Sequence, residues 1–274
     1  MVSEVLDRYR QLTRDGMRWQ VDEEFVHTDT FKTLVQNAAN LQPPDSQGAK
    51  RRRGHLSWLL TADDENASLF VKKYYPRNPV NRFQYSFKPN RATNEFNANL
   101  RFQQLGLPTP RLLAWGERRR YNLWVNSLLI FEGFSEGITL KEIDWAGRDI
   151  DSLIDSMSRT IGRLHNSNIY FGDLHGGNLL VIPNGSEHRW LFTDLDKVRF
   201  KTSLSEHLCV DDLARLNAHV DASVAQRMSF LRKYCRMRRL REVKRWYALV
   251  NQRSEYLWRK YQKKHGIDVR KYAM

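Results

Sequence analysis

The chain changes its pattern of hydrophobic residues near its middle. Up to residue 131, short apolar or alternating runs such as 55–61 and 68–75 are typical of strands, and from residue 150 onward apolar residues recur every three to four positions, as in helices. A strand-rich half followed by a helix-rich half indicates an α+β chain with two lobes. We therefore expect an N-terminal lobe over 1–131, with an antiparallel sheet and helices, and a mainly helical C-terminal lobe over 132–274.

Turn residues and periodicity divide the first lobe further. They predict helices over 2–16, 30–40 and 91–105, two pairs of strands over 55–61 with 68–75 and 111–117 with 123–131, a loop over 41–54 and an irregular insertion over 76–90. In the second lobe, the pattern predicts a long helix over 150–166, short strands and loops over 169–200, and helices in the remainder.

Composition narrows the class of protein. With 274 residues, 41% hydrophobic and 28% charged, the chain can bury a large core without disulfides. It has no apolar stretch of about 18 residues and no signal-peptide pattern, and its two cysteines, Cys209 and Cys235, form no framework. These features predict a cytoplasmic enzyme or binding module with buried, reduced thiols.

The net charge of +14 is concentrated at the C-terminal end. Residues 231–274 hold 15 Lys and Arg against three acids, and an apolar stripe from Leu240 to Tyr261 predicts a docked helix with a basic outer face. That face is either simply solvated or contacts an anionic surface, and in the second case Trp246 and Trp258 are candidates for a headgroup boundary.

Three polar residues in the second lobe have the spacing of a metal-assisted phosphoryl-transfer site. Asp173 precedes Asn178 by five residues in IYFGDLHGGNLLV, and Asp194 ends the strand-like run in WLFTDLDKV. Asn and Asp supply the hard oxygen ligands that Mg²⁺ prefers, while a carboxylate without metal can accept the proton of an attacking hydroxyl.

These motifs resemble the protein-kinase-like fold, and within it the lipopolysaccharide core kinases of Gram-negative bacteria, the Kdo and heptose kinase family. The resemblance covers about residues 50–220. It is carried by LFVKK, ATNEFNANL, FNANLRFQQLGLPTPRLLAWGE, FEGFSEGITL, IGRLHNSNIYFGDLHGGNLLV, WLFTDLDKVRF and DDLARL, in that order.

The resemblance implies a role for each matching residue. Asp173 would be the catalytic base, and Asn178 and Asp194 would bind Mg²⁺. Lys72 would hold the phosphates of ATP and Glu95 would hold Lys72. Glu132, in the segment similar to the hinge, and His175, where many protein kinases have Lys, would contact the nucleotide.

The chain also departs from the pattern. Phe171 stands where a His usually braces the loop, and the metal loop reads DLD, so Asp196 is an extra acid that is either a second ligand or an ordinary surface acid. No G-x-G-x-x-G precedes Lys72, and Gly48 and Gly54 are the only candidates for a phosphate-covering loop. Lys73 adjoins Lys72, and strand alternation allows only one of the two to face the nucleotide.

The leading interpretation is an ATP- and Mg²⁺-dependent kinase for a heptose or Kdo hydroxyl of the lipopolysaccharide inner core. The expected partner is then an anionic glycolipid, which the basic C-terminal helices would meet at the cytoplasmic face of the inner membrane; nucleic acid is not expected. An atypical protein kinase or ATPase of the RNA-maturation type and a nucleotide-binding pseudokinase remain as alternatives.

Overall fold

The computed structural model describes residues 7–36, 38, 41–43, 49–52, 54–61, 68–134, 136–147, 149–184, 187–218 and 220–265. The chain forms two compact units, Met1–Ser135 and Glu136–Met274. The change of periodicity near residue 131 therefore coincides, within a few residues, with a division of the structure.

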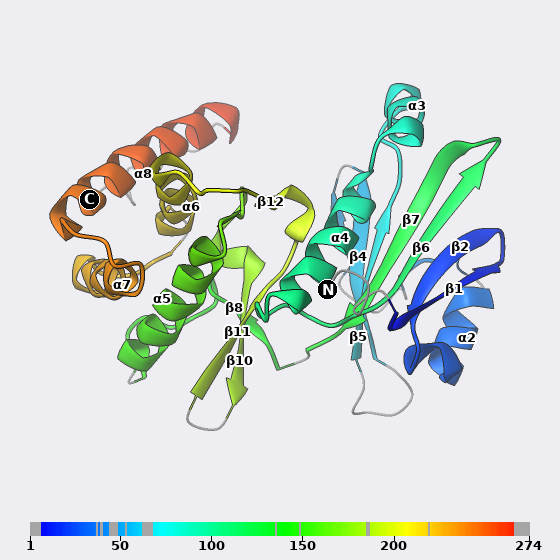
Figure 1. Cartoon of the computed structure of the whole chain (residues 1–274), viewed down its shortest axis with the longest axis horizontal. Helices are drawn as coiled ribbons and strands as arrows, with labels where there is room; N and C mark the ends of the chain where they lie inside the picture. The colour runs from blue at the N-terminus through cyan, green and yellow to red at the C-terminus, as the bar shows by residue number, and fades with distance from the viewer. Residues whose placement is uncertain are drawn as a thin grey trace. The chain divides into compact units, whose positions relative to one another are not determined.

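The first unit is built on an antiparallel seven-stranded sheet in the order β1-β2-β6-β7-β5-β4-β3 (Figure 1). The strands are β1 (Tyr9–Arg14), β2 (Met17–Asp22), β3 (Lys50–Arg52), β4 (His55–Thr61), β5 (Ser68–Tyr74), β6 (Leu112–Arg120) and β7 (Leu123–Glu132). Its helices are a 3₁₀ turn η1 (Phe25–His27), α2 (Asp29–Gln36), α3 (Pro79–Phe87) and α4 (Arg91–Gln104).

Two apolar clusters cover opposite faces of this sheet. On one face, Phe31 and Val35 of α2 pack with Trp19, Trp58 and other buried strand residues. On the other face, α4 buries a stripe of side chains against Phe70 and Tyr74 of β5 and against Trp124, Leu129 and Phe131 of β7. Alternation along each strand thus decides which helix a strand side chain meets.

The expected helix over 2–16 is wrong for the residues that the structure describes. Tyr9–Arg14 is a strand, paired in register with Met17–Asp22. Asp15 and Gly16 connect them with φ values of 50° and 66°. An Asp-Gly pair with both residues in the left-handed region is the favoured two-residue hairpin turn, and this local signal outweighs the helix-like spacing of Tyr9 and Leu12.

The irregular insertion over 76–90 is also a wrong expectation, because Pro79–Phe87 is the helix α3. Asn78 caps it by accepting a hydrogen bond from the Asn81 backbone N–H at 2.8 Å, and Pro79 occupies the first turn, where its missing N–H has no partner to lose. Part of the predicted loop 41–54 is likewise strand β3, while Gly48 and Arg53 lie outside the described residues.

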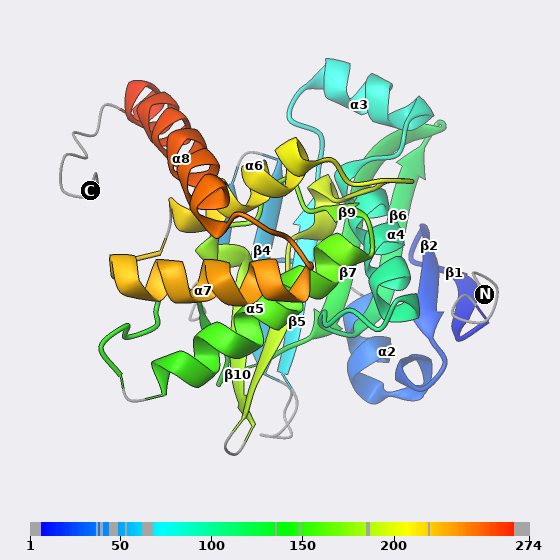
Figure 2. The same ribbon diagram turned by 60° about the vertical axis from the view of Figure 1, so that its left-hand side comes forward.

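The second unit combines small sheets with a helical bundle, as the sequence predicts. Its strands form the ladders β11-β10-β8 and β12-β9. They are β8 (Ile138–Thr139), β9 (Ile169–Tyr170), β10 (Leu179–Asn184), β11 (Glu187–Phe192) and β12 (Arg199–Phe200), with 3₁₀ turns η2 (Gly176–Asn178) and η3 (Leu195–Lys197). The helices are α5 (Ile150–Asn166), α6 (Glu206–Asn217), α7 (Val224–Met237) and α8 (Val243–His265), with α5 beside α7 and α6 beside α8 (Figure 2).

The C-terminal helix docks by a stripe that differs in part from the expected one, because α8 begins at Val243, after Leu240, and Tyr261 is 42% exposed. Trp246, Val250 and Ser254 are buried at a spacing of four residues. The expectation that Trp246 could sit at a headgroup boundary is therefore wrong, because it is 3% exposed and packs edge-on against Tyr234. Within the described part of the chain, no helix has both the length and the apolar character that crossing a membrane requires.

Candidate active site

In the first unit, a buried ion pair joins the sheet to α4. Lys72 of β5 and Glu95 of α4 are 6% and 2% exposed, and the Lys72 Nζ lies 2.6 Å from the Glu95 Oε1. The Tyr74 hydroxyl donates to the other carboxylate oxygen of Glu95 at 2.7 Å. Both strand residues occupy even positions, which face α4. We call Lys72, Glu95 and Tyr74 the lysine site.

The local sequence fixes the two elements that carry this pair. Asn90 caps α4, because its side chain accepts from the Thr93 backbone N–H at 3.0 Å, and its amide also donates to the buried Glu117 at 2.9 Å. Glu95 lies in the second turn of this helix, whose start is tied to the sheet by Asn90. Its carboxylate is therefore positioned both by the helix and by its contacts with Lys72 and Tyr74 of β5.

Lys73 belongs to the opposite face of the sheet. Its Nζ donates to the Leu41 carbonyl at 3.0 Å, and burial, assisted by the charge of Arg118, lowers the pKa of Lys73. The alternative that the sequence left open is thus decided geometrically: it is Lys72, not Lys73, that pairs with Glu95.

Two aromatic rings that the sequence did not single out flank the lysine site. The Lys72 Nζ lies 5.8 Å from the ring centre of Phe70 and 5.7 Å from that of Phe131. A desolvated ammonium gains from such ring faces, so one carboxylate and two rings surround the Lys72 Nζ. Phe131 could have been predicted beside Lys72 only if the face of β7 that packs on α4 had been known.

Glu132 ends β7 next to this region. Its backbone N–H donates to the Arg111 carbonyl at 2.9 Å, and its side chain is exposed. The following Gly133 N–H donates to the Ser68 carbonyl at 2.7 Å, so the end of β7 is tied to the start of β5. A role for Glu132 in nucleotide binding stays a prediction.

In the second unit, Asp173 lies on a loop whose backbone is fixed by hydrogen bonds to α6. The Phe171 and Gly172 N–H groups donate to the two carboxylate oxygens of Asp212 at 2.7 and 2.9 Å. Phe171 itself is fully buried and packs against Phe192, with ring centres 5.6 Å apart. The brace lost with the usual histidine is therefore replaced by ring packing and by a carboxylate from α6.

The loop presents the Asp173 carboxylate while its backbone is fixed. The Asn178 amide nitrogen donates to the Asp173 carbonyl at 3.0 Å. The Lys197 Nζ lies 2.6 Å from the Asp173 Oδ2, and the side chain of Asp173 remains 22% exposed. Lys197 and Asp212 were missed by sequence reasoning, since they lie 24 and about 40 residues away along the chain.

Asn178 and Asp194 lie at the same end of the β10–β11 hairpin. The last residue pair of the hairpin at this end is Leu179 with Phe192. Just beyond it, the Thr193 N–H donates to the Asn178 carbonyl at 3.0 Å. Asp194 follows at once, in the left-handed region with φ 61° and ψ 55°. A non-glycine residue held there stores strain that tertiary contacts must balance, which is common at functional sites.

The chemistry of these two side chains fits a magnesium ion. The Asn178 amide nitrogen donates to the Asp173 carbonyl, so its amide oxygen is the atom that would ligate a metal ion, and Asp194 would add a carboxylate. We call Asp173, Asn178 and Asp194 the aspartate site. Asp196, two residues on, is half-buried within η3, and its role as a second ligand stays a prediction.

His175 caps the short turn η2. Its Nδ1 accepts the Gly177 N–H at 3.1 Å, which places the ring proton of the neutral form on Nε2. An N–H at Nε2 is a possible donor to phosphate, and this contact remains a prediction.

A buried polar network lies behind the loop of Asp173. His165 of α5 is fully buried, with Nδ1 2.7 Å from the Tyr234 hydroxyl and Nε2 3.5 Å from the Asp212 Oδ2. Burial alone would lower the pKa of His165, but hydrogen bonding to Asp212 and Cys209 raises it above its ordinary value. Desolvation in turn raises the pKa of Tyr234.

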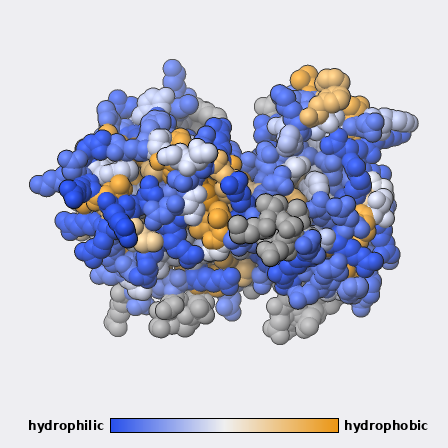
Figure 3. Space-filling view, viewed as in Figure 1, coloured by the Kyte–Doolittle hydropathy of each residue, from blue (hydrophilic) through white to orange (hydrophobic). Residues whose placement is uncertain are grey.

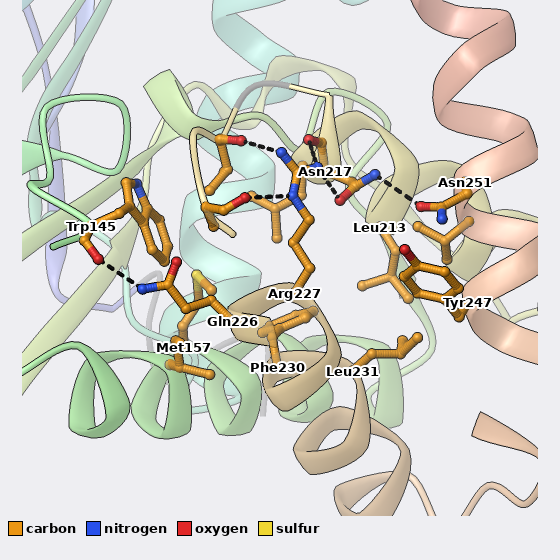
Figure 4. A pocket seen from close by; sticks show the side chains of 15 residues that line it. Trp145, Met157, Leu213, Asn217, Gln226, Arg227, Phe230, Leu231, Tyr247 and Asn251 are labelled. Atoms are coloured by element: carbon orange, nitrogen blue, oxygen red, sulfur yellow. Dashed lines mark hydrogen bonds between the residues drawn. The ribbon is translucent and has the colours of Figure 1, made fainter. Parts of the chain in front are cut away.

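An apolar pocket lies among the helices of the same unit (Figure 4). It has an empty volume of about 540 Å³ including its mouth, and Met157, Leu213 and Phe230 are among its lining residues. Arg227 closes one side by donating to the Asn217, Val220 and Ala222 carbonyls, and burial lowers the pKa of its guanidinium. The residues of the aspartate site are not part of its lining.

Comparisons with known proteins show which proteins this chain resembles. A 3-deoxy-D-manno-octulosonic acid kinase of Actinobacillus succinogenes is 27% identical over 206 residues, which are 69% of this chain and 77% of the relative. The solved structure of WaaP in complex with acyl carrier protein superposes with a TM-score of 0.61 at 20% identity, covering 88% of this chain and 99% of that one. The fold is therefore that of WaaP, a bilobal protein-kinase-like fold.

The family model is more specific than either similarity. It matches residues 46–234, more than half of the chain, and this range contains both the lysine site and the aspartate site. The chain belongs to the lipopolysaccharide kinase (Kdo/WaaP) family, and it is accordingly an ATP-dependent phosphotransferase that acts on a sugar hydroxyl of the lipopolysaccharide core.

Proposed function

We propose that the acceptor is a Kdo hydroxyl of the lipopolysaccharide inner core, with a heptose hydroxyl as the second candidate, and that transfer requires Mg²⁺. The relative named as a 3-deoxy-D-manno-octulosonic acid kinase favours Kdo. The observation that carries the mechanism is the aspartate site itself: a partly exposed carboxylate on a loop fixed by Asn178 and Asp212, next to two oxygen ligands at the end of one hairpin.

Each residue then has one task. Asp173 orients the acceptor hydroxyl and accepts its proton at a carboxylate oxygen. Lys197, 2.6 Å from that carboxylate, pairs with it and restricts its rotation. Asn178 and Asp194 would hold Mg²⁺, which supplies charge neutralisation on the phosphates when bound.

The lysine site would act on the nucleotide. Lys72 is held by Glu95, whose other carboxylate oxygen accepts from Tyr74, so it offers a fixed cation to the phosphates and does not need to be ordered when ATP arrives. Covalent chemistry by the protein is not required, since positioning and charge neutralisation lower most of the barrier in phosphoryl transfer.

The acceptor is anionic and membrane-borne, so we also propose a peripheral position at the cytoplasmic face of the inner membrane. Exposed basic residues of α8, such as Lys244, Lys260 and Lys263, support this proposal. Part of the basic face serves docking instead: Arg245 pairs with Glu206 at 2.6 Å and Arg253 donates to Asp211 at 2.8 Å.

The decisive experiment is a transfer assay with γ-labelled ATP, Mg²⁺ and dephosphorylated lipopolysaccharide, run beside the Asp173→Ala variant. We use two acceptors, one truncated after Kdo and one that also carries heptose. Label on both acceptors that vanishes in the variant supports Kdo, and label on the longer acceptor alone supports heptose. ATP binding without label on either acceptor would overturn the proposal.

A further inference from the structure

One surface of the first unit exposes large apolar side chains that its fold does not explain. On α3, Val80, Phe83 and Phe87 are 72%, 63% and 74% exposed, and this helix has no buried residue. Their spacing of three and four positions places them on one face of the helix. Figure 3 shows hydrophobic residues gathered where α3 lies in Figure 1.

This face is held outward by contacts on the other side of the helix. The Ser86 hydroxyl accepts the Trp124 backbone N–H at 2.9 Å, and Arg119 donates to the Ser86 carbonyl at 2.8 Å. Tyr85 packs edge-on against Trp124, with ring centres 5.5 Å apart. Because the inner side of α3 is fixed to the β6–β7 hairpin, the outer stripe cannot turn inward without breaking these bonds.

The tip of that hairpin adds one more aromatic residue. Tyr121 is 84% exposed at the two-residue turn between β6 and β7, and the Arg120 guanidinium lies over its ring at 5.4 Å. We call Val80, Phe83, Phe87 and Tyr121 the α3 patch. An amphipathic ring at such a tip suits a boundary between water and an apolar phase.

The two segments that carry the α3 patch contain only basic charges. Segment 76–91 contains Arg77, Arg82, Lys88 and Arg91 and no acid, and segment 118–131 contains three Arg and no acid. Arg119 is neutralised by Glu117 at 2.7 Å, but Arg77, Lys88 and Arg120 are exposed. An apolar stripe rimmed by cations is complementary to a bilayer with anionic headgroups.

The α3 patch is smaller than the interface that a stable complex with another protein buries. A stable interface takes about 20–30 residues on each side, whereas four apolar side chains form the centre of this surface. A few large side chains that insert below the headgroups, with cations at headgroup level, need no such area.

We propose that the α3 patch docks the protein on an anionic bilayer, with Phe83 and Phe87 inserted and the surrounding Arg and Lys at the headgroups. The proposal deepens the proposed function, because it names the surface through which a kinase of a membrane-borne glycolipid would reach its acceptor. It differs from the basic face of α8 in that it supplies apolar insertion as well as charge.

The test is sedimentation with vesicles, in the absence of ATP and acceptor. Wild type should bind vesicles of phosphatidylcholine with about 30% phosphatidylglycerol, a content chosen for charge density, and should bind pure phosphatidylcholine much more weakly. Phe83→Ser/Phe87→Ser should weaken binding about tenfold or more, since the free energy of moving two large apolar side chains from water into the bilayer is lost. Leu105→Ser/Val224→Ser, which changes two exposed apolar residues elsewhere, should bind as wild type.

A labelling experiment locates the contact. Cys209 and Cys235 are buried, so a thiol-reactive, environment-sensitive dye can be placed at Gln84→Cys on the outer face of α3 or at Gln11→Cys on β1, both exposed positions. Anionic vesicles should shift the emission of the dye at position 84 to the blue and leave that at position 11 unchanged.

Three outcomes would overturn the proposal. The first is equal vesicle binding by wild type and the Phe83/Phe87 double variant, and the second is loss of binding in Lys260→Glu/Lys263→Glu alone, which would assign docking to α8. The third is concentration-dependent dimerisation that the double variant abolishes, without vesicle binding by wild type. The vesicle experiment contains no acceptor, so its result does not depend on the transfer assay. The proposal for the acceptor and the proposal for the α3 patch can therefore fail independently.

Discussion

The lysine site and the aspartate site are held in place by opposite means. In the lysine site both charged groups are buried, and their contacts are made by side chains: the carboxylate of Glu95 receives Lys72 and Tyr74. In the aspartate site the backbone is fixed, through Asn178 and Asp212, while the Asp173 carboxylate remains accessible.

This difference teaches where stability and catalysis are coupled. A buried ion pair that loses one member leaves an uncompensated charge, so a change in the lysine site should affect folding as well as activity. A partly exposed carboxylate can be replaced at little cost to folding, so a change there should affect activity alone.

The largest effect is expected from Asp173→Asn, which keeps the shape of the side chain and removes the proton acceptor. Transfer to the acceptor should fall by about 10³-fold, with the thermal midpoint and ATP affinity near those of wild type. The matched control is Asp155→Asn, another partly exposed aspartate of the second unit with a lysine neighbour at 3.6 Å, which should retain activity. Unfolding of Asp173→Asn at ambient temperature would remove the contrast between the two sites.

The lysine site gives the next largest effect. Lys72→Met should lose most activity and about 3–5 kcal/mol of stability, because the buried carboxyl group of Glu95 loses the lysine that pairs with it. Lys73→Met, on the same strand but facing Leu41, should lose only about 1 kcal/mol with its hydrogen bond to the Leu41 carbonyl and should keep its activity. Denaturant titrations of both variants provide the stabilities.

The double variant Lys72→Met/Glu95→Gln separates the two consequences. Removing the stranded charge while leaving a partner for Tyr74 should recover at least half of the lost stability and none of the lost activity. Recovery of activity together with stability would mean that Lys72 acts only through folding.

A smaller effect should follow from Asp212→Asn, which weakens the brace behind Asp173. An amide can accept at one oxygen only, so either the Phe171 or the Gly172 N–H loses its partner. We expect a loss of stability of about 1–3 kcal/mol and a fall in kcat of about 10- to 100-fold, of the size seen when supporting residues are changed, with the KM for ATP little altered. A rise in that KM with kcat unchanged would assign Asp212 to the nucleotide and not to the loop.

The sequence predicts the elements whose periodicity is long and regular, and it fails where a short local signal decides. Strands 55–61 and 68–75 and helix 150–166 are confirmed nearly to the residue. The hairpin at Asp15–Gly16 and the helix begun by Asn78 depend on two-residue signals that a search for periodicity overlooks.

For the site, spacing along the chain predicts which residue types are needed but not which face they occupy. Strand alternation places Lys72 and Lys73 on opposite faces, yet only the position of α4 shows which face holds Glu95. Lys197 and Asp212 are invisible to spacing, because their contacts with the loop exist only once η3 and α6 are packed. The roles assigned to Glu132 and His175 stay predictions.

The smallest expected effect concerns pH, and it tests whether the brace of the aspartate site is charged. Hydrogen bonding to Asp212 and Cys209 outweighs burial and raises the folded-state pKa of His165 above that of an unfolded chain, about 6.5. A raised folded-state pKa gives stability that is complete below the unfolded pKa and is lost as pH rises through the folded one. The free energy of unfolding should therefore decline as pH is raised above about 6.5, and His165→Gln should flatten that decline. His207→Gln, at an exposed position on α6, should leave it unchanged. Equal slopes in all three proteins would mean that His165 does not titrate on folding, and that Asp212 braces the loop of Asp173 without a buried cation beside it.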